Sequence, residues 1–170
     1  DTPSIVKSRP IHNQSANAIL LNLNKVRHFI FVKDKIPFEK KMDKVIFRGK
    51  VNEGKTKRIA FFNKYFGNPL YDLGDTSRNG NPAWRTGKKT IAEHLRYKFI
   101  LALEGNDVAS NLKWVMSSNS VAVMPRPEFE TWFMEGRLIP NYHYIEIKPD
   151  FSDLEERIAY YTAHPDEAIE

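Results

Sequence analysis

The sequence predicts an α/β fold in which a parallel sheet carries helices on its faces. Residues 99–103 form a continuous apolar run, which is typical of a strand buried on both faces, and residues 120–124 predict a second buried strand. Segments with apolar residues at helical spacing alternate with these runs, as crossovers between parallel strands require. The length of 170 residues and the apolar fraction of 41% suit one globular domain with its own core.

The first ninety residues predict a mixture of short elements and one long loop. In chain order they are a helix at 16–27, strands at 28–32 and 45–48, a helix at 55–66, and a loop at 67–90 around a short strand at 70–73. Apolar residues recur at helical spacing in both helices. The loop holds four of the eight glycines, and a loop of this length in a small domain is usually functional or mobile.

The second half of the chain is more regular. It predicts strands at 99–103, 120–124 and 144–147, a turn at 104–106, a helix from residue 107, a short helix at 128–134, and helices that begin near residues 152 and 165. Ser152 and Glu155 have the spacing of a capping box, in which each side chain bonds the other residue's backbone N–H. The helix after them presents Leu154, Ile158 and Tyr161 on one face.

Composition excludes several classes of site. The chain has no cysteine, so it contains neither a disulfide nor a cysteine metal site. Its five histidines lack metal-ligand spacing, and no apolar run has the length needed to cross a bilayer. We therefore expect a cytoplasmic protein without a bound metal, and a peripheral position at the inner membrane is the open alternative.

Charge is distributed unevenly along the chain. Residues 1–60 carry 14 Lys and Arg against 5 Asp and Glu, whereas residues 121–170 carry 4 against 11. A basic half suits an anionic partner, such as a phosphorylated substrate, an anionic lipid head group or nucleic acid. A solvated basic face explains the same charge equally well.

Two predicted strand ends carry groups that suit a phosphate, and ligands of parallel sheets bind at the carboxyl ends of the strands. The first is Arg48-Gly49-Lys50, where the arginine has the geometry to clamp a diphosphate in bidentate fashion. An ion pair with a surface carboxylate is the alternative for Arg48.

The second strand end is Gly105, followed by a predicted helix whose N-terminus would favour an anion. Hydrogen-bonding or charged side chains in and after this turn are Asn106, Asp107, Ser110, Asn111 and Lys113. Asp107 is also a simple helix N-cap. Glu130 has the chemistry to reach a ribose or sugar hydroxyl, although a solvated carboxylate at a helix start is an equally ordinary role.

The order of these motifs resembles glycosyltransferase family 90, and most closely its bacterial lipopolysaccharide core transferases. The motifs are Phe47-Arg48-Gly49, Tyr97-Lys98-Phe99-Ile100-Leu101, Glu104-Gly105-Asn106, Ser110-Asn111-Leu112-Lys113, Trp132-Phe133, Asn141-Tyr142-His143-Tyr144-Ile145 and Ser152-Asp153-Leu154. Each motif is short and unspecific, but the ordered set is specific to this family.

The resemblance implies the Rossmann-like donor-binding domain of a GT-B glycosyltransferase. It implies a UDP-sugar donor, a lipopolysaccharide core or related glycan acceptor, inversion at the anomeric carbon, and no required metal or cofactor. Arg48 matches an arginine expected near the donor diphosphate, Gly105 matches the glycine of the phosphate-side turn, and Lys113 matches a lysine on the following helix. Asn111 departs from the eukaryotic relatives, which carry an arginine there that faces the diphosphate.

The resemblance also divides the chain into two parts. Residues 45–170 are expected to form the nucleotide-sugar-binding domain, and residues 1–44 are expected to lead to an acceptor-side domain that the chain lacks. The family's catalytic base is expected in that domain. If this chain supplies the base itself, the candidates are Asp72, Asp75 and Glu130. The alternative function is a non-catalytic basic domain that binds nucleic acid or an anionic surface.

Overall fold

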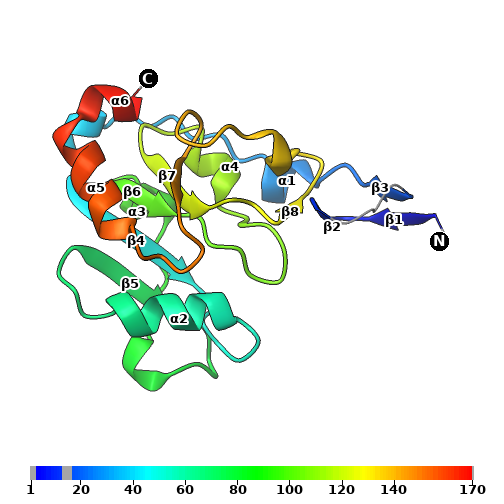
Figure 1. Cartoon of the computed structure of the whole chain (residues 1–170), viewed down its shortest axis with the longest axis horizontal. Helices are drawn as coiled ribbons and strands as arrows, with labels where there is room; N and C mark the ends of the chain where they lie inside the picture. The colour runs from blue at the N-terminus through cyan, green and yellow to red at the C-terminus, as the bar shows by residue number, and fades with distance from the viewer. Residues whose placement is uncertain (1–2, 13–16, 170) are drawn as a thin grey trace.

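The computed structural model describes residues 3–12 and 17–169 (Figure 1). Its strands are β1 (Ser4–Val6), β2 (Arg9–Pro10), β3 (Ala18–Leu20), β4 (Met42–Gly49), β5 (Tyr71–Asp75), β6 (Tyr97–Leu101), β7 (Val121–Pro125), β8 (Phe129–Glu130) and β9 (Ile145–Ile147). Its α-helices are α1 (Lys25–His28), α2 (Thr56–Tyr65), α3 (Ile91–His94), α4 (Leu112–Val115), α5 (Leu154–Ala163) and α6 (Pro165–Ile169). The described residues also form three short 3₁₀ helices, η1 (Phe38–Lys40), η2 (Pro82–Trp84) and η3 (Glu135–Arg137).

Within the described residues, a five-stranded parallel sheet has the strand order β5-β4-β6-β7-β9. The chain runs outward from β4 to β5 and then returns past β4 to form β6. The crossovers leave β4 and β6 in opposite directions, which makes the β4/β6 boundary the topological switch point. This sheet confirms the predicted α/β, Rossmann-like architecture and the strands predicted at 45–48, 70–73, 99–103, 120–124 and 144–147.

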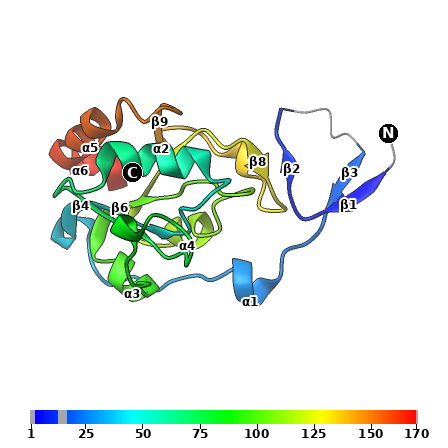
Figure 2. The same ribbon diagram turned by 90° about the horizontal axis from the view of Figure 1, so that it is seen from below.

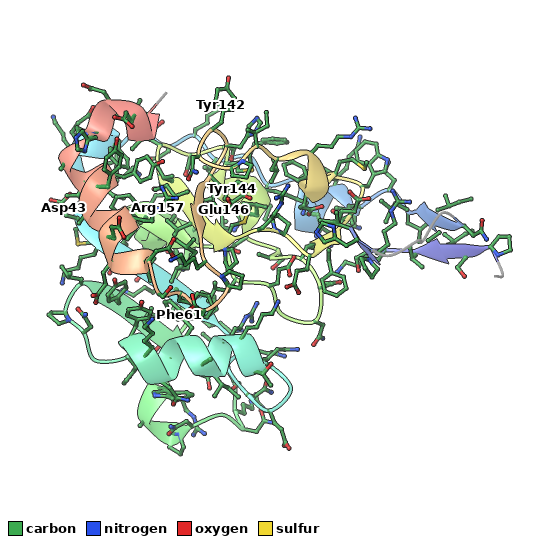
Figure 3. All side chains as sticks on the ribbon, viewed as in Figure 1. Asp43, Phe61, Tyr142, Tyr144, Glu146 and Arg157 are labelled. Carbon is green, nitrogen blue, oxygen red and sulfur yellow. The ribbon has the colours of Figure 1, made fainter. Side chains whose placement is uncertain are left out.

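Helices cover both faces of the sheet, with α2 and α5 on one face and α3 and α4 on the other (Figure 2). The core on the α2 face contains Phe61, Phe62, Leu154 and Ile158 from the helices, packed on Val45, Phe47 and Phe99. Phe61 lies between α2 and the sheet (Figure 3). The opposite core packs Leu112 and Val115 on Ile46, Ile100 and Ala122. Neighbouring residues of β4 therefore point to opposite faces, as strand geometry requires.

The N-terminal segment forms an arm beside this sheet (Figure 1). β1 and β3 pair in parallel with Ile5 opposite Ile19, and β2 pairs antiparallel with β8. Nearer the sheet, Lys41 forms a buried ion pair of 2.6 Å with Asp34. None of the helices in the described part of the chain is long and apolar enough to cross a membrane.

Two elements predicted in the N-terminal segment are wrong. Of residues 16–27, residue 16 lies outside the described ranges, residues 18–20 form β3, and α1 begins only at Lys25. Ile19 is 64% exposed, so the helical spacing of apolar residues there does not mark a buried face. Residues 28–32 form no strand either, and the N–H of Val32 donates to the Ser117 hydroxyl instead of a neighbouring strand.

Three local predictions in the second half also fail. The helix expected from residue 107 begins only at Leu112, and the Asp107 carboxylate, which was expected to cap it, accepts from Lys7 and Ser8 on the distant arm instead. The helix expected at 128–134 is replaced by β8, which pairs with β2. Asp153, not Ser152, precedes α5, without a side-chain cap, whereas a complete capping box starts α3 at Thr90 and Glu93.

Candidate functional site

A pocket of about 250 Å³ lies at the topological switch point of the sheet. Its lining comes from the end of the β4–α2 loop and the first turn of α2, from the turn after β6, and from Phe129 of β8 with the residue before it. The lining residues are Gly54, Lys55, Thr56, Lys57, Arg58, Glu104, Gly105, Asn106, Glu128 and Phe129. Ligands of open parallel sheets bind in this position, because the two connections diverge there and leave a crevice. The position makes this pocket the candidate ligand site.

The N-terminus of α2 forms one wall of the pocket. No side chain caps this helix, and the residue before it is Lys55. The first N–H groups of an α-helix have no partner within the helix, and the helix dipole adds a partial positive charge there. Lys55, Lys57 and Arg58 add three cationic side chains to this wall. The wall therefore suits an anion.

Arg58 holds the two diverging segments together. Its guanidinium donates to the carbonyls of Lys50, Leu103 and Glu104, with distances of 3.0, 2.6 and 3.0 Å. The guanidinium also stacks on the Phe47 ring, with 5.4 Å from its carbon to the ring centroid. Burial lowers the pKa of Arg58 from its ordinary value, although an arginine stays charged at neutral pH.

Two glycines stand against this guanidinium. A Cβ at Gly105 would lie 3.0 Å from one terminal nitrogen of Arg58 and 3.3 Å from its central carbon. A Cβ at Gly49 would lie 3.4 Å from the other terminal nitrogen and would also overlap the Phe47 ring. Both positions therefore favour glycine because of close approach, and side chains there would crowd the guanidinium.

A buried aspartate fixes the loop that leads from β4 to α2. Asp75, at the end of β5, is fully buried and accepts from the N–H of Val51 at 2.9 Å. Its carboxylate also accepts from the N–H and the hydroxyl of Ser77, both at 2.7 Å. Gly80 packs against this carboxylate, where a Cβ would overlap it. The full set of internal hydrogen bonds explains Asp75 as a structural residue.

The opposite wall of the pocket is acidic. Burial raises the pKa of Glu104, whose carboxylate accepts from the N–H groups of Glu128 and Phe129 at 3.1 and 3.2 Å. Glu128 forms an exposed ion pair of 2.5 Å with Lys57 across the pocket. The ion pair between Glu128 and Lys57 thus joins the acidic wall to the helix wall at the rim of the pocket. Glu104 positions the start of β8 through its hydrogen bonds.

Arg48 lies on the opposite face of the sheet from Arg58. It forms an ion pair of 2.5 Å with Asp72 and donates to the Asp72 carbonyl at 2.7 Å. The Asp72 carboxylate also accepts from the Tyr97 hydroxyl. Burial opposes ionisation of Asp72, but the hydrogen bonds from Tyr97 and Arg48 and the nearby cations keep its pKa below the usual value. A role of Arg48 toward a donor stays a prediction.

The other predicted site residues are dispersed. Of these, Gly105 and Asn106 line the pocket at the switch point. Lys113 is buried and pairs with Glu135 at 2.9 Å. The Asn111 amide donates to the Leu101 carbonyl at 3.0 Å, and Glu130 pairs with Arg9 at 2.8 Å. Ser110 and Lys50 have exposed side chains. Sequence reasoning missed Arg58. Its only signal in the sequence was a cation in the first turn of the helix that follows Gly49.

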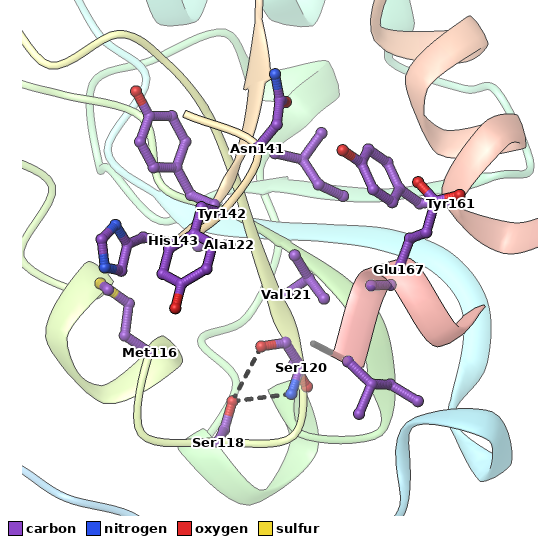
Figure 4. Close-up of a pocket in the computed structure, with 14 residues that line it drawn as sticks. Met116, Ser118, Ser120, Val121, Ala122, Asn141, Tyr142, His143, Tyr161 and Glu167 are labelled. Carbon is purple, nitrogen blue, oxygen red and sulfur yellow. Dashed lines mark hydrogen bonds between the residues drawn. The ribbon is translucent and has the colours of Figure 1, made fainter. Parts of the chain in front are cut away.

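A second pocket, of about 240 Å³, lies at the amino ends of β7 and β9 (Figure 4). Its lining includes Ser120, Asn141, Tyr142, His143 and Glu167. Tyr142 is 70% exposed and projects from the edge of the molecule (Figure 3). The lining has no lysine or arginine, so this pocket does not suit a diphosphate. Among the described side chains, no cluster of three or more metal-ligating residues is present.

Comparison with known proteins assigns the class. Residues 20–170 match the sequence model of glycosyl transferase family 90, and the chain therefore belongs to this family. It is 42% identical over 169 residues to the O-glucosyltransferase LpsA of Dichelobacter nodosus, an alignment that covers 99% of the chain and 52% of that relative. It is also 26% and 25% identical over 144 residues to the protein O-glucosyltransferases 1 of rat and human, covering 79% of the chain and 36% of each relative. The chain thus spans about half the length of the bacterial relative.

Proposed function

We propose that this chain supplies the donor-binding part of a glycosyltransferase that moves a hexose from a UDP-sugar to a lipopolysaccharide core or related glycan. Family membership and the names of the relatives support sugar transfer. The observation that carries the donor assignment is the pocket at the topological switch point, with the uncapped start of α2 and three cations in its lining. The diphosphate is the anion that this wall would hold.

The proposed reaction is a direct displacement with inversion and without a metal. A base takes the proton of the acceptor hydroxyl, the hydroxyl oxygen bonds to the anomeric carbon, and the bond from that carbon to the UDP oxygen breaks. Negative charge develops on the departing UDP. Preorganised cations and N–H groups at the pocket would stabilise it, which is typically worth about 3 kcal/mol for one well-placed donor.

The three candidate bases within the chain are poorly suited to that step. Asp75 is fully buried and internally hydrogen-bonded. Asp72 is paired with Arg48, and Glu130 with Arg9. The base is therefore proposed to come from the acceptor-side domain of the enzyme. A cytoplasmic location with peripheral contact to the anionic membrane surface accompanies this proposal.

The alternative of a nucleic-acid-binding basic domain has no support from the relatives, which are glucosyltransferases by name.

Calorimetric titration of the chain with UDP, ADP, GDP and CDP tests the proposal directly. We expect saturable binding of UDP at one site and binding at least about tenfold weaker for the other three, after which UDP-glucose and UDP-galactose identify the sugar. Equal affinity for all four nucleotides, or binding of none, would contradict the proposed donor.

A further inference from the structure

The second pocket, at the amino ends of β7 and β9, is termed the amino-edge pocket. The strands of the sheet are parallel, so their amino ends and carboxyl ends lie at opposite edges. The amino-edge pocket therefore lies at the edge opposite the proposed donor pocket, and the two linings share no residue. Its volume of about 240 Å³ is below the roughly 300–1,000 Å³ of sites for drug-sized ligands, which suits a ligand of one small ring.

Tyr144 gives the amino-edge pocket a buried hydrogen-bonding group that the protein does not pair. This residue immediately precedes β9, is 2% exposed and belongs to the lining. Among the described residues, its hydroxyl has no hydrogen-bond partner. Burial raises the pKa of Tyr144 to about 12, so the hydroxyl keeps its proton at neutral pH. Leaving a buried hydroxyl unpaired is unfavourable, and a ligand oxygen in the pocket would pair it.

The turn before β9 supplies two further donors. It is closed by hydrogen bonds from the Asn141 N–H to the Tyr144 carbonyl and from the His143 N–H to the Ile139 carbonyl, at 2.8 and 2.9 Å. The Asn141 amide oxygen accepts from the N–H of Glu146 at 3.2 Å, so its NH₂ group is available to a ligand. The Nδ1 atom of His143 accepts from the N–H of Ile139 at 2.8 Å, which places the proton of the neutral ring on Nε2.

The lining also contains an acceptor and an exposed aromatic ring. The Glu167 carboxylate accepts from the Tyr160 hydroxyl at 2.9 and 3.0 Å and keeps further lone pairs for a ligand. The Tyr142 ring stands edge-on to the His143 ring, with 4.8 Å between centroids, and its side chain is largely exposed. These side chains come from the turn before β9 and from α6, and Figure 4 shows them around the pocket.

We propose that the amino-edge pocket binds one neutral hexose residue of a glycan, as a second carbohydrate site that takes no part in sugar transfer. Each hydroxyl of a sugar both donates and accepts, and one face of the ring is apolar. Tyr144, Asn141 and His143 offer the donors, Glu167 offers an acceptor, and the Tyr142 ring suits the apolar face.

The charge of the lining selects an uncharged sugar. It includes no lysine or arginine, and Glu167 is acidic, so a phosphorylated or acidic sugar would find no counter-ion. The site goes beyond the proposed function, because it uses no residue of the donor pocket. A glycan chain held there would raise the local concentration of glycan at the enzyme.

The test locates the sugar and removes single groups from the site. Methyl glucoside, methyl galactoside and glycerol are each titrated into the ¹⁵N-labelled chain, and the backbone amide shifts are followed by NMR. Tyr144→Phe removes only the hydroxyl; its matched control is Tyr71→Phe, whose hydroxyl is also buried and unpaired in the described part of the chain but lies outside the pocket. Tyr142→Ala removes the exposed ring, and Phe31→Ala, at a side chain 76% exposed and outside the lining, is its control.

We expect one or both glycosides to shift the amides of residues 118–120 and 141–145 saturably, with a Kd of about 1 mM, as ordinary ligand efficiency gives for a single sugar ring. Tyr144→Phe and Tyr142→Ala should each weaken this binding about fivefold, and both controls should stay within about twofold of wild type. Thermal unfolding of Tyr144→Phe should occur at the wild-type temperature or above, because its hydroxyl has no partner to lose. A purely structural hydroxyl would leave the sugar affinity unchanged.

The contrary outcomes are equally defined. Absence of sugar binding, or wild-type affinity in both Tyr144→Phe and Tyr142→Ala, would refute the second site. Equal shifts with glycerol would reduce it to a pocket for any polyol, which also refutes it. Shifts confined to residues 54–58 and 104–106 would place the hexose in the donor pocket, refuting the second site and supporting the proposed function. Sugar binding at the amino-edge pocket of a chain that does not bind UDP would support the second site and contradict only the proposed donor. If Tyr144→Phe is unfolded, Tyr142→Ala decides.

Discussion

Replacing Lys113 by methionine should destabilise the protein by about 3–5 kcal/mol, because it leaves the Glu135 carboxylate buried without its cation. The two side chains are 3% and 1% exposed and lie 2.9 Å apart. Glu135 would keep its hydrogen bonds from the N–H and hydroxyl of Thr131, at 2.7 and 3.0 Å. Because these bonds still stabilise the carboxylate, we expect a destabilisation in the lower half of that range. Because a domain of this size is typically stable by about 5–15 kcal/mol, the loss should still be large.

Urea denaturation followed by tryptophan fluorescence measures this loss, with Trp114 as the neighbouring probe. The double variant Lys113→Met, Glu135→Leu completes a thermodynamic cycle. It removes the unpaired charge but leaves the Thr131 N–H and hydroxyl without an acceptor, which costs about 1–3 kcal/mol. We therefore expect the double variant to be more stable than Lys113→Met alone.

The same variant decides between two roles for Lys113. The sequence resemblance gives it to the donor site, whereas the structure pairs it with Glu135 and places it over the Phe133 ring. A stability loss with UDP affinity unchanged in the folded protein supports the structural role. The reasoning is refuted if Lys113→Met changes stability by less than about 1 kcal/mol, or if it selectively weakens UDP binding.

Three further predictions use other parts of the structure. Arg48→Ala should lower stability by about 1.5–3 kcal/mol through loss of the Asp72 pair, with UDP affinity falling less than in Arg58→Gln, a variant of the pocket lining; the reverse pattern would place Arg48 in the donor site. Gly105→Ala should weaken UDP binding in wild type but add little in Arg58→Gln, as calorimetry will show; equal losses in both backgrounds would separate Gly105 from the cation. Burial lowers the pKa of His94 below its unfolded value of 6.5, so the unfolded chain binds more protons as pH falls through 6.5. The stability at pH 5 relative to pH 7 should therefore drop more in wild type than in His94→Gln, and parallel pH profiles would refute this.

The candidate site was predictable in its position and less so in its residues. Glycine after a buried strand marked both Gly49 and Gly105, and the structure places them on either side of one guanidinium. The residue between them, Arg58, escaped notice because its three carbonyl partners lie 8, 45 and 46 positions away in the chain. Arg48 attracted attention as the cation at the strand end, but strand alternation turns it to the face opposite Phe47.

The sequence by itself determined the parallel sheet, the two longer helices and the family. Continuous apolar runs such as residues 99–103 record burial on both faces, and α2 and α5 show their buried stripes through local periodicity. Tertiary contacts alone decided the segments without such a stripe. Residues 18–20 and 129–130 became strands because β1 and β2 lie beside them, and Asp107 left its predicted cap because Lys7 and Ser8 reach it. In these segments the local preference is weak, so a partner from another part of the chain is enough to set the backbone.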